Sequence, residues 1–163
     1  MFGFGKKKQT VPAAAAVVST PMAGRLLPLG EVPDPVFSQG LVGPGFAVEP
    51  SEGTVRAPSA GKVVMIAPTL HAVGLRTTGG AELLVHVGID SVTLKGEGLR
   101  ALVSVGDTVE AGQPLLEADL ALLSARIPST ITPVLVTNAD GFTLSEPRLN
   151  AAFGETVLEV TGR

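Results

Sequence analysis

The sequence contains no cysteine, no tryptophan and no tyrosine in its 163 residues. Without cysteine the protein has no disulfides, no thiolate metal sites and no thiol nucleophile, a composition compatible with the cytoplasm. No apolar run approaches the roughly 20 residues that a membrane-spanning helix needs. The net charge of -3 is small and no basic stripe is present, so nucleic acid is not an expected partner.

Short apolar segments between turn residues are what the chain does contain. Its 20 glycines and 13 prolines separate valine- and leucine-rich runs, which predict strands over 25–29, 45–50, 54–58, 62–67, 82–89, 101–105, 132–138 and 156–162. Only 116–127 has helical spacing, through Leu116, Leu120, Leu123 and Ile127. The pattern predicts an all-β fold, an antiparallel barrel-like sandwich with at most short helices.

The N-terminus differs in composition from the rest of the chain. We expect residues 1–18 to form a flexible tail and residues 19–163 a single domain. Lys6 to Lys8 followed by small apolar residues loosely resemble a secretory signal, but the apolar stretch is short and no cleavage motif follows it. The segment "MFGFGKKK" would suit at most a peripheral contact with a membrane surface.

One segment occurs twice. "TPMAGRLLPL" (20–29) aligns without a gap to "APSAGKVVMI" (57–66), and both have the order small, Pro, any residue, Ala, Gly, basic, aliphatic. In each copy Pro and Gly would shape a turn that leads into a strand. Two copies indicate an architecture built by duplicating one β-motif, although similar hairpins can also converge on similar turns.

His86 is one of only two histidines and lies within the apolar run "ELLVHVGI". Strand alternation places Leu84, His86 and Gly88 on one face, and Leu83, Val85, Val87 and Ile89 on the opposite, core-facing side. A single histidine of this kind is more often structural than catalytic.

The second histidine changes that balance. His71 precedes His86 by one strand and a turn, an arrangement that can bring both rings together on a sheet, and the hydroxyl of Thr69 could orient the ring of His71. Zinc-binding HxH and HExxH patterns and the serine nucleophile motif GxSxG are absent. A phosphoryl group on a neutral histidine nitrogen remains possible, and without a P-loop its donor would be a phosphoprotein.

Between about Thr20 and Val160 the chain contains the segments "VPDPVFSQGLVGPGFAVEP", "TLHAVGLRTTGGAELLVHVGIDSV", "LKGEGL", "VGDTVEAGQPLLEADL" and "STITPVLVTN". This series of segments resembles the glucose-type IIA phosphocarriers of the bacterial sugar phosphotransferase system. The resemblance implies a phosphoryl transfer from the histidine phosphocarrier protein HPr to this chain, and from it to the IIB domain of a sugar permease.

The resemblance also implies roles for single residues. His86 matches the phosphorylated histidine, His71 the histidine that stabilises the phosphoryl group, and Thr69 the hydroxyl that bonds to His71. Partner contacts are implied for Phe37, Leu84, Asp34 and Asp90. The chain departs from the family at Leu84, where the family often has Phe, and at Ala67 and Pro68, where it often has an aromatic residue and an acid. The resemblance therefore implies a smaller apolar rim around the site, which affects the preference for partners.

No cofactor is required for this chemistry, although the family implies that His71 and His86 can bind zinc together with a partner's carboxylate, and that the unphosphorylated domain can bind regulatory proteins. Two other classes of protein share parts of this pattern. A biotinyl or lipoyl carrier would need a lysine at a hairpin tip, and Lys62 and Lys95 are the only lysines of the predicted domain. A lysostaphin-type zinc peptidase would need a third ligand in an HxH arrangement.

Overall fold

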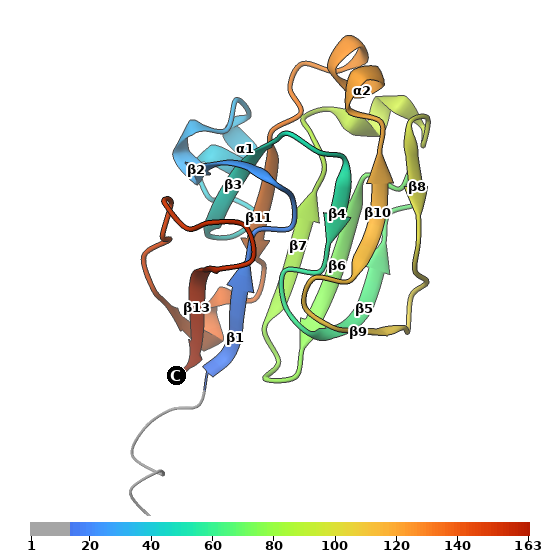
Figure 1. The fold of residues 1–163 in the computed structure, drawn as a ribbon. Helices are drawn as coiled ribbons and strands as arrows, with labels where there is room; N and C mark the ends of the chain where they lie inside the picture. Colours follow the sequence, from blue (N-terminus) through green and yellow to red (C-terminus); the bar gives the residue numbers. More distant parts are fainter. Residues whose placement is uncertain (1–13) are drawn as a thin grey trace, which may run out of the picture.

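The computed structural model describes residues 14–163 (Figure 1). The predicted tail is corrected at its end: residues 14–18 belong to the first strand, β1, where they pair with the last strand of the chain. Val18 is completely buried there, so tertiary packing recruits these small and β-branched residues into the sandwich. Residues 1–13, the rest of that prediction, lie outside the described residues.

Antiparallel strands are the main regular elements of the structure. In the described residues the strands are β1 (Ala14–Ser19), β2 (Gly24–Pro28), β3 (Gly45–Pro50), β4 (Thr54–Arg56), β5 (Gly61–Ile66), β6 (Ala72–Thr77), β7 (Glu82–His86), β8 (Leu99–Ala101), β9 (Thr108–Val109), β10 (Pro114–Ala118), β11 (Thr132–Val136), β12 (Phe142–Leu144) and β13 (Thr156–Gly162). The helices are α1 (Pro35–Ser38), α2 (Leu120–Arg126) and the 3-10 turns η2 (Leu29–Glu31), η3 (Ser91–Leu94) and η4 (Ala139–Gly141).

The strands form one large and two small sheets. The seven-stranded sheet has the order β2-β3-β11-β7-β6-β5-β9, and the three-stranded sheets are β4-β10-β8 and β1-β13-β12. Figure 1 shows β4, β10 and β8 layered across β7, β6 and β5. The all-β prediction is confirmed, with a sandwich in which the sheets are not closed into a barrel.

The main core lies between these layers. Val63, Leu75 and Leu83 of the large sheet are buried in the same cluster as Val55 and Leu115 of the small sheet. Burial of each such side chain stabilises the fold by about 1.5–3 kcal/mol. This core is why the face of β7 that carries Leu83 and Val85 must point inward, leaving Leu84 and His86 for the outer face.

The repeated segment occupies equivalent places. Gly24 and Gly61 each begin the first strand of an antiparallel pair, β2 with β3 and β5 with β6. A Cβ atom would lie 2.1 Å from the carbonyl oxygen of Glu49 at Gly24, and 2.4 Å from that of Arg76 at Gly61. The glycine of the repeat is therefore explained by the close approach of the partner strand's backbone.

The predicted helix begins later than its spacing indicates. α2 starts after Asp119, whose carboxylate accepts a hydrogen bond from the Leu122 backbone N–H, while Leu116 is a completely buried residue of β10. Leu116 pairs with both β4 and β8. Its helical spacing from Leu120 is accidental, because a buried central strand also consists of apolar residues.

A second, smaller apolar cluster covers part of the outer face of the seven-stranded sheet. The connection between β2 and β3 folds over this face and contributes Val32 and Phe37, which pack with Leu27, Ala47, Ile89 and Leu135. Leu84 is partly buried against the same cluster. The uncovered part of the outer face lies on β5, β6 and β7, and the two histidines are found at the boundary.

Candidate active site

His86 is the last residue of β7, and the register pairs it with Ala72, the first residue of β6. Leu83 and Val85 are 2% and 1% exposed, whereas His86 is half-buried on the outer face, as alternation predicts. Ile89 departs from the prediction: it is buried in the second cluster with Phe37. The alternation ends because Gly88 adopts a left-handed conformation with φ +74°.

Gly88 determines the orientation of the His86 ring. A Cβ atom at this position would lie 2.6 Å from Cδ1 of Ile127 and 3.1 Å from the carbonyl oxygen of Ser129. The Gly88 carbonyl oxygen is 2.9 Å from Nδ1 of His86. Since a carbonyl oxygen can only accept, Nδ1 carries the proton of the neutral ring and Nε2 carries the lone pair.

His71 lies in the turn between β5 and β6. Leu70 adopts a left-handed conformation with φ +65°, and Thr69 Oγ1 lies 2.6 Å from Nδ1 of His71. The backbone carbonyl of His71 accepts a hydrogen bond of 2.7 Å from the N–H of Val87. This bond ties the turn to the end of β7, beside His86.

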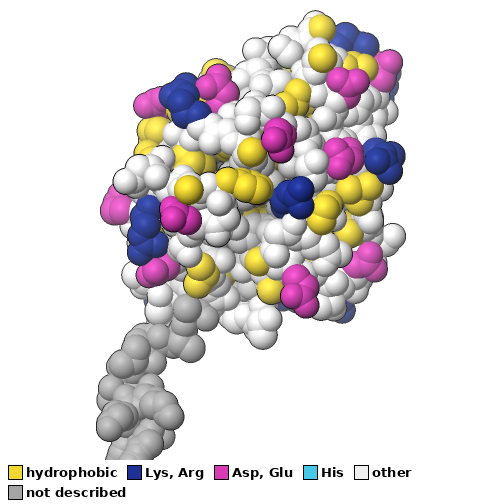
Figure 2. All heavy atoms as spheres, viewed as in Figure 1, with side chains coloured by type: hydrophobic (Ala, Val, Ile, Leu, Met, Phe, Trp, Pro, Cys, Tyr) yellow, Lys and Arg dark blue, Asp and Glu magenta, His cyan; other side chains and the backbone are white. Residues whose placement is uncertain are grey.

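The structure brings both histidines and Phe37 together in one depression. The ring centroids of His71 and His86 are 5.0 Å apart with an interplanar angle of 77°, and those of Phe37 and His86 are 4.8 Å apart. The depression holds about 200 Å³ and is lined by Asp34, Val36, Phe37, His71, His86, Asp90, Ser91 and Val92. No histidine is visible on the face shown in Figure 2, so the depression opens elsewhere.

Burial lowers the pKa of His86, and the charge of a protonated His71 would lower it further. The Gly88 carbonyl and the carboxylate of Asp34 act in the opposite direction without reversing the shift. Burial also lowers the pKa of His71. Both rings are therefore largely neutral at pH 7, and a neutral imidazole has the lone pair that a nucleophile requires.

The residues predicted to contact partners have different surroundings. Asp34 accepts a 2.9 Å hydrogen bond from the Val36 backbone N–H, which caps α1, and Asp90 is exposed at the rim with φ 59°. Phe37 is only 7% exposed and packs against the His86 ring. Leu84 is half-buried against the second cluster. Phe37 therefore forms a wall of the depression beside His86, whereas Leu84 does not line the depression and lines a separate pocket with Val64 and Met65.

Two exposed apolar residues at the rim were not predicted. Val36 is 45% exposed and Val92 is 52% exposed, and both line the depression. Val36 directly precedes Phe37 in the motif "DPVF", which is the only sequence signal for it. Their exposure depends on how α1 and η3 fold beside the strand ends, which alternation along a strand does not reveal.

The chain itself provides two histidines for a metal ion. In residues 14–163 no group of three or more His, Asp or Glu side chains is arranged to hold one. Lys62 lies in β5 and Lys95 follows η3, so neither is in the segment after Glu117, where the resemblance to a biotinyl or lipoyl carrier would place the modified lysine. No described helix has the length and apolarity to cross a membrane.

Comparisons with known proteins agree with one another. Residues 16–142 match the family of the phosphoenolpyruvate-dependent sugar phosphotransferase system, EIIA 1. The chain is 43% identical, over 97% of its length and 94% of the relative's, to the PTS system glucose-specific EIIA component of Halalkalibacterium halodurans. It is 44% identical to the component of the same name from Staphylococcus aureus, over 86% and 82% of the two chains.

A solved structure extends the comparison to the fold. The structure of glucose permease IIA from Mycoplasma capricolum matches with a TM-score of 0.84 at 35% identity, and the match covers 90% of this chain and 96% of that one. The sandwich and these matches define a phosphocarrier of sugar phosphotransfer. The chain belongs to the EIIA 1 family of the phosphoenolpyruvate-dependent sugar phosphotransferase system, and the resemblance found in the sequence is confirmed. These relatives do not favour the carrier-domain or zinc-peptidase alternatives.

Proposed function

We propose that Nε2 of His86 accepts a phosphoryl group from HPr and passes it to the IIB domain of a sugar permease, with the help of His71. The hydrogen bond from Nδ1–H of His86 to the Gly88 carbonyl carries this proposal. It holds the ring in the tautomer whose free lone pair is on Nε2, and it disfavours reaction at Nδ1.

The transfer balances without a cofactor. The Nε2 lone pair attacks phosphorus, the bond from phosphorus to the donor's histidine nitrogen breaks, and its electron pair returns to the donor ring. The phosphorylated His86 ring keeps its Nδ1 proton, and the Gly88 carbonyl stabilises the positive charge that the ring acquires. Delivery to IIB reverses these steps, with the partner's side chain as the nucleophile.

His71 and Thr69 contribute a hydrogen bond to the phosphoryl group in this proposal. When the Thr69 hydroxyl donates to Nδ1 of His71, the proton of the neutral ring is on Nε2. Nε2–H can then donate to a phosphoryl oxygen on His86, since the ring centroids are only 5.0 Å apart. Such a donor helps most when charge develops during transfer.

The rim of the depression suits a protein partner. Exposed Val36 and Val92 provide apolar contact, and Asp34 and Asp90 provide negative charge at the edge. A partner with an apolar centre and basic side chains around it is complementary to this rim. The proposed donor of the phosphoryl group, HPr, is itself phosphorylated from phosphoenolpyruvate. Because donor and acceptor must meet, the proposal places the chain in the cytoplasm. The relatives are named glucose-specific, so a glucose permease is the first IIB source to test.

Zinc is a subordinate part of the proposal. Two imidazoles on one tetrahedral zinc ion have ring centres about 5 Å apart, given Zn–N distances of about 2.0–2.1 Å. The His71 and His86 centroids are 5.0 Å apart, so the pair fits two ligand positions. A regulatory partner's carboxylate would supply a third ligand. Zinc should tighten binding of such a partner to the unphosphorylated chain, and His71→Gln should remove the zinc effect in a pull-down with and without chelator.

Phosphorylation tests the main proposal. Incubation with radiolabelled phosphoenolpyruvate, enzyme I and HPr should label the chain, and the label should be labile to acid and stable to base. His86→Ala should take up no label, whereas His71→Gln should still be labelled. Circular dichroism should verify that both variants are folded. Undiminished labelling of His86→Ala would refute the assignment.

A further inference from the structure

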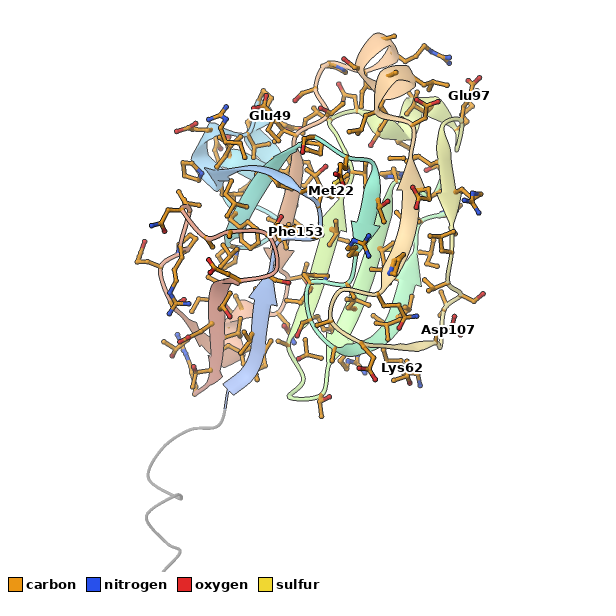
Figure 3. All side chains as sticks on the ribbon, viewed as in Figure 1. Met22, Glu49, Lys62, Glu97, Asp107 and Phe153 are labelled. Atoms are coloured by element: carbon orange, nitrogen blue, oxygen red, sulfur yellow. The ribbon has the colours of Figure 1, made fainter. Side chains whose placement is uncertain are left out.

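A larger cavity lies at the other end of the exposed part of the sheet. It holds about 470 Å³, is formed by β5, β6 and β9, and shares no lining residue with the histidine depression. Figure 3 labels Lys62, one of its lining residues, at the end of the sheet away from α2. Arg76 lies four residues along β6 from Ala72, the pairing partner of His86, which corresponds to about 13 Å.

Two positive charges face one another in this cavity. The register pairs Lys62 of β5 directly with Arg76 of β6, and Lys62 also pairs with Thr108 of β9. Like charges directly opposite each other in an antiparallel pair destabilise it. Glu82, which the register pairs with Arg76 from the β7 side, offsets part of this repulsion, and an anion between Lys62 and Arg76 would offset the rest.

Arg76 has one carboxylate partner and retains N–H groups that can donate to a ligand. Its Nε and Nη2 each donate one proton to Oε2 of Glu82, which leaves the two Nη1 protons and one Nη2 proton for another acceptor. Lys62 forms no ion pair with any other residue in 14–163. The cavity therefore combines a free ammonium group with a partly free guanidinium group, which is a suitable pair for a phosphate.

Among the other lining residues, Thr78, Thr108 and Glu110 suit a ligand with hydroxyl groups, and Ala60, Val64 and Val109 add apolar surface. Thr78 and Thr108 line the cavity and are exposed, so their hydroxyl groups can contact a ligand. Glu110 is exposed on the same cavity and would repel a bare anion, but its carboxylate can accept hydrogen bonds from hydroxyl groups. The volume of about 470 Å³ falls within the range of small-molecule sites.

We propose that this cavity binds a small phosphate monoester that carries free hydroxyl groups, the chemical class of a sugar phosphate. Lys62 and Arg76 bind the phosphate, and Glu110 accepts from the hydroxyl groups of the body. The site is separate from His86, so its occupancy does not depend on phosphoryl transfer. His86→Ala should bind the ligand as well as the unmodified chain does.

The test is a titration of the isotopically labelled full chain with glucose 6-phosphate, inorganic phosphate and glucose, followed by amide chemical shifts. Glucose 6-phosphate should cause saturable shifts at Lys62, Arg76 and Thr108, phosphate should bind more weakly, and glucose should not bind. Lys62→Met should weaken glucose 6-phosphate binding about tenfold. Lys95→Met is the matched control, an exposed lysine outside the cavity, and should bind normally.

Glu110→Gln tests the hydroxyl contact separately from the charge. It removes repulsion, so inorganic phosphate should bind more tightly, while the preference for glucose 6-phosphate over phosphate should shrink. Non-saturable shifts, shifts outside the cavity, or equal affinity of Lys62→Met and the unmodified chain would overturn the proposal. Equal affinity for phosphate and glucose 6-phosphate would overturn the assigned ligand class.

Discussion

The two histidines of the site rest on different kinds of support. His86 ends a central strand, β7, which has β11 on one side and β6 on the other, and Phe37 packs against its ring. His71 lies in a turn, and its position depends on the left-handed Leu70, on the hydroxyl of Thr69 and on one backbone hydrogen bond to Val87. The sheet thus fixes one ring, and local hydrogen bonds fix the other.

This difference fits the proposed division of labour. A nucleophile must be held close to the line of attack, and small displacements slow the reaction strongly. A hydrogen-bond donor to a phosphoryl oxygen tolerates more variation, since three oxygens are available to it. We therefore expect changes beneath His86 to affect acceptance and delivery alike, and changes at the turn to affect delivery selectively.

Replacing His71 should distinguish the roles of the two histidines most clearly. In His71→Gln, acceptance from HPr should survive, because Nε2 of His86 and its Gly88 hydrogen bond are untouched. Delivery to IIB should fall by about a hundredfold or more, since the donor that stabilises the moving charge is lost. Rapid-quench transfer from the prephosphorylated variant to IIB measures this. Normal delivery would remove the proposed role of His71.

Gly88→Ala should disturb the support of His86, the histidine that the sheet holds in place. The new Cβ atom would lie 2.6 Å from Cδ1 of the buried Ile127 and 3.1 Å from the backbone carbonyl oxygen of Ser129, at a φ of +74°. We expect a loss of about 2 kcal/mol in the free energy of unfolding and slower phosphorylation of His86. Gly112→Ala is the matched control: its φ is +87° and nothing lies within 4 Å of its Cβ position, so it has the backbone strain without the collision. Equal effects of the two substitutions in urea denaturation would argue against the collision.

The sequence predicts the fold well where a strand shows its own periodicity, as in the β7 region. It misses β6, because Gly74 and Arg76 interrupt the apolar pattern, and this strand is defined by its pairing with β5 and β7. It extends the helix back to Leu116 because a buried strand and a helix face have similar composition. Elements that depend on partners far along the chain are thus the ones that local patterns do not reveal.

The candidate site likewise has features that the sequence predicts and features that it does not. The outward position of His86 and the proximity of Thr69 to His71 follow from spacing along the chain. The burial of Phe37 does not, because it depends on the β2–β3 connection folding over the outer face. The same fold exposes Val36, which no periodicity indicates.

Thr69→Val should slow delivery to IIB by a smaller amount than His71→Gln, because it affects only the orientation of the His71 ring. Valine has the same shape but no hydroxyl, so the His71 ring loses its 2.6 Å partner while remaining in the turn. Delivery to IIB should slow about tenfold, the usual value of one side-chain hydrogen bond in a site, with acceptance unchanged. Thr69→Ser should restore delivery. If serine were as slow as valine, the hydroxyl would not be the orienting group.

The smallest expected effect concerns protonation of His86. Its pKa is lowered, chiefly by burial, so the unfolded chain takes up this proton at a higher pH than the folded chain does. Stability should therefore be full above about pH 6.5 and should fall as the pH decreases through that value toward the folded pKa. The melting temperature of the unmodified chain should thus drop more steeply over this range than that of His86→Gln.

Phe37→Leu, which uncovers part of the ring, should raise the pKa of His86 toward its ordinary value in an NMR titration. An unchanged pKa in Phe37→Leu would mean that the aromatic ring is not what shields His86.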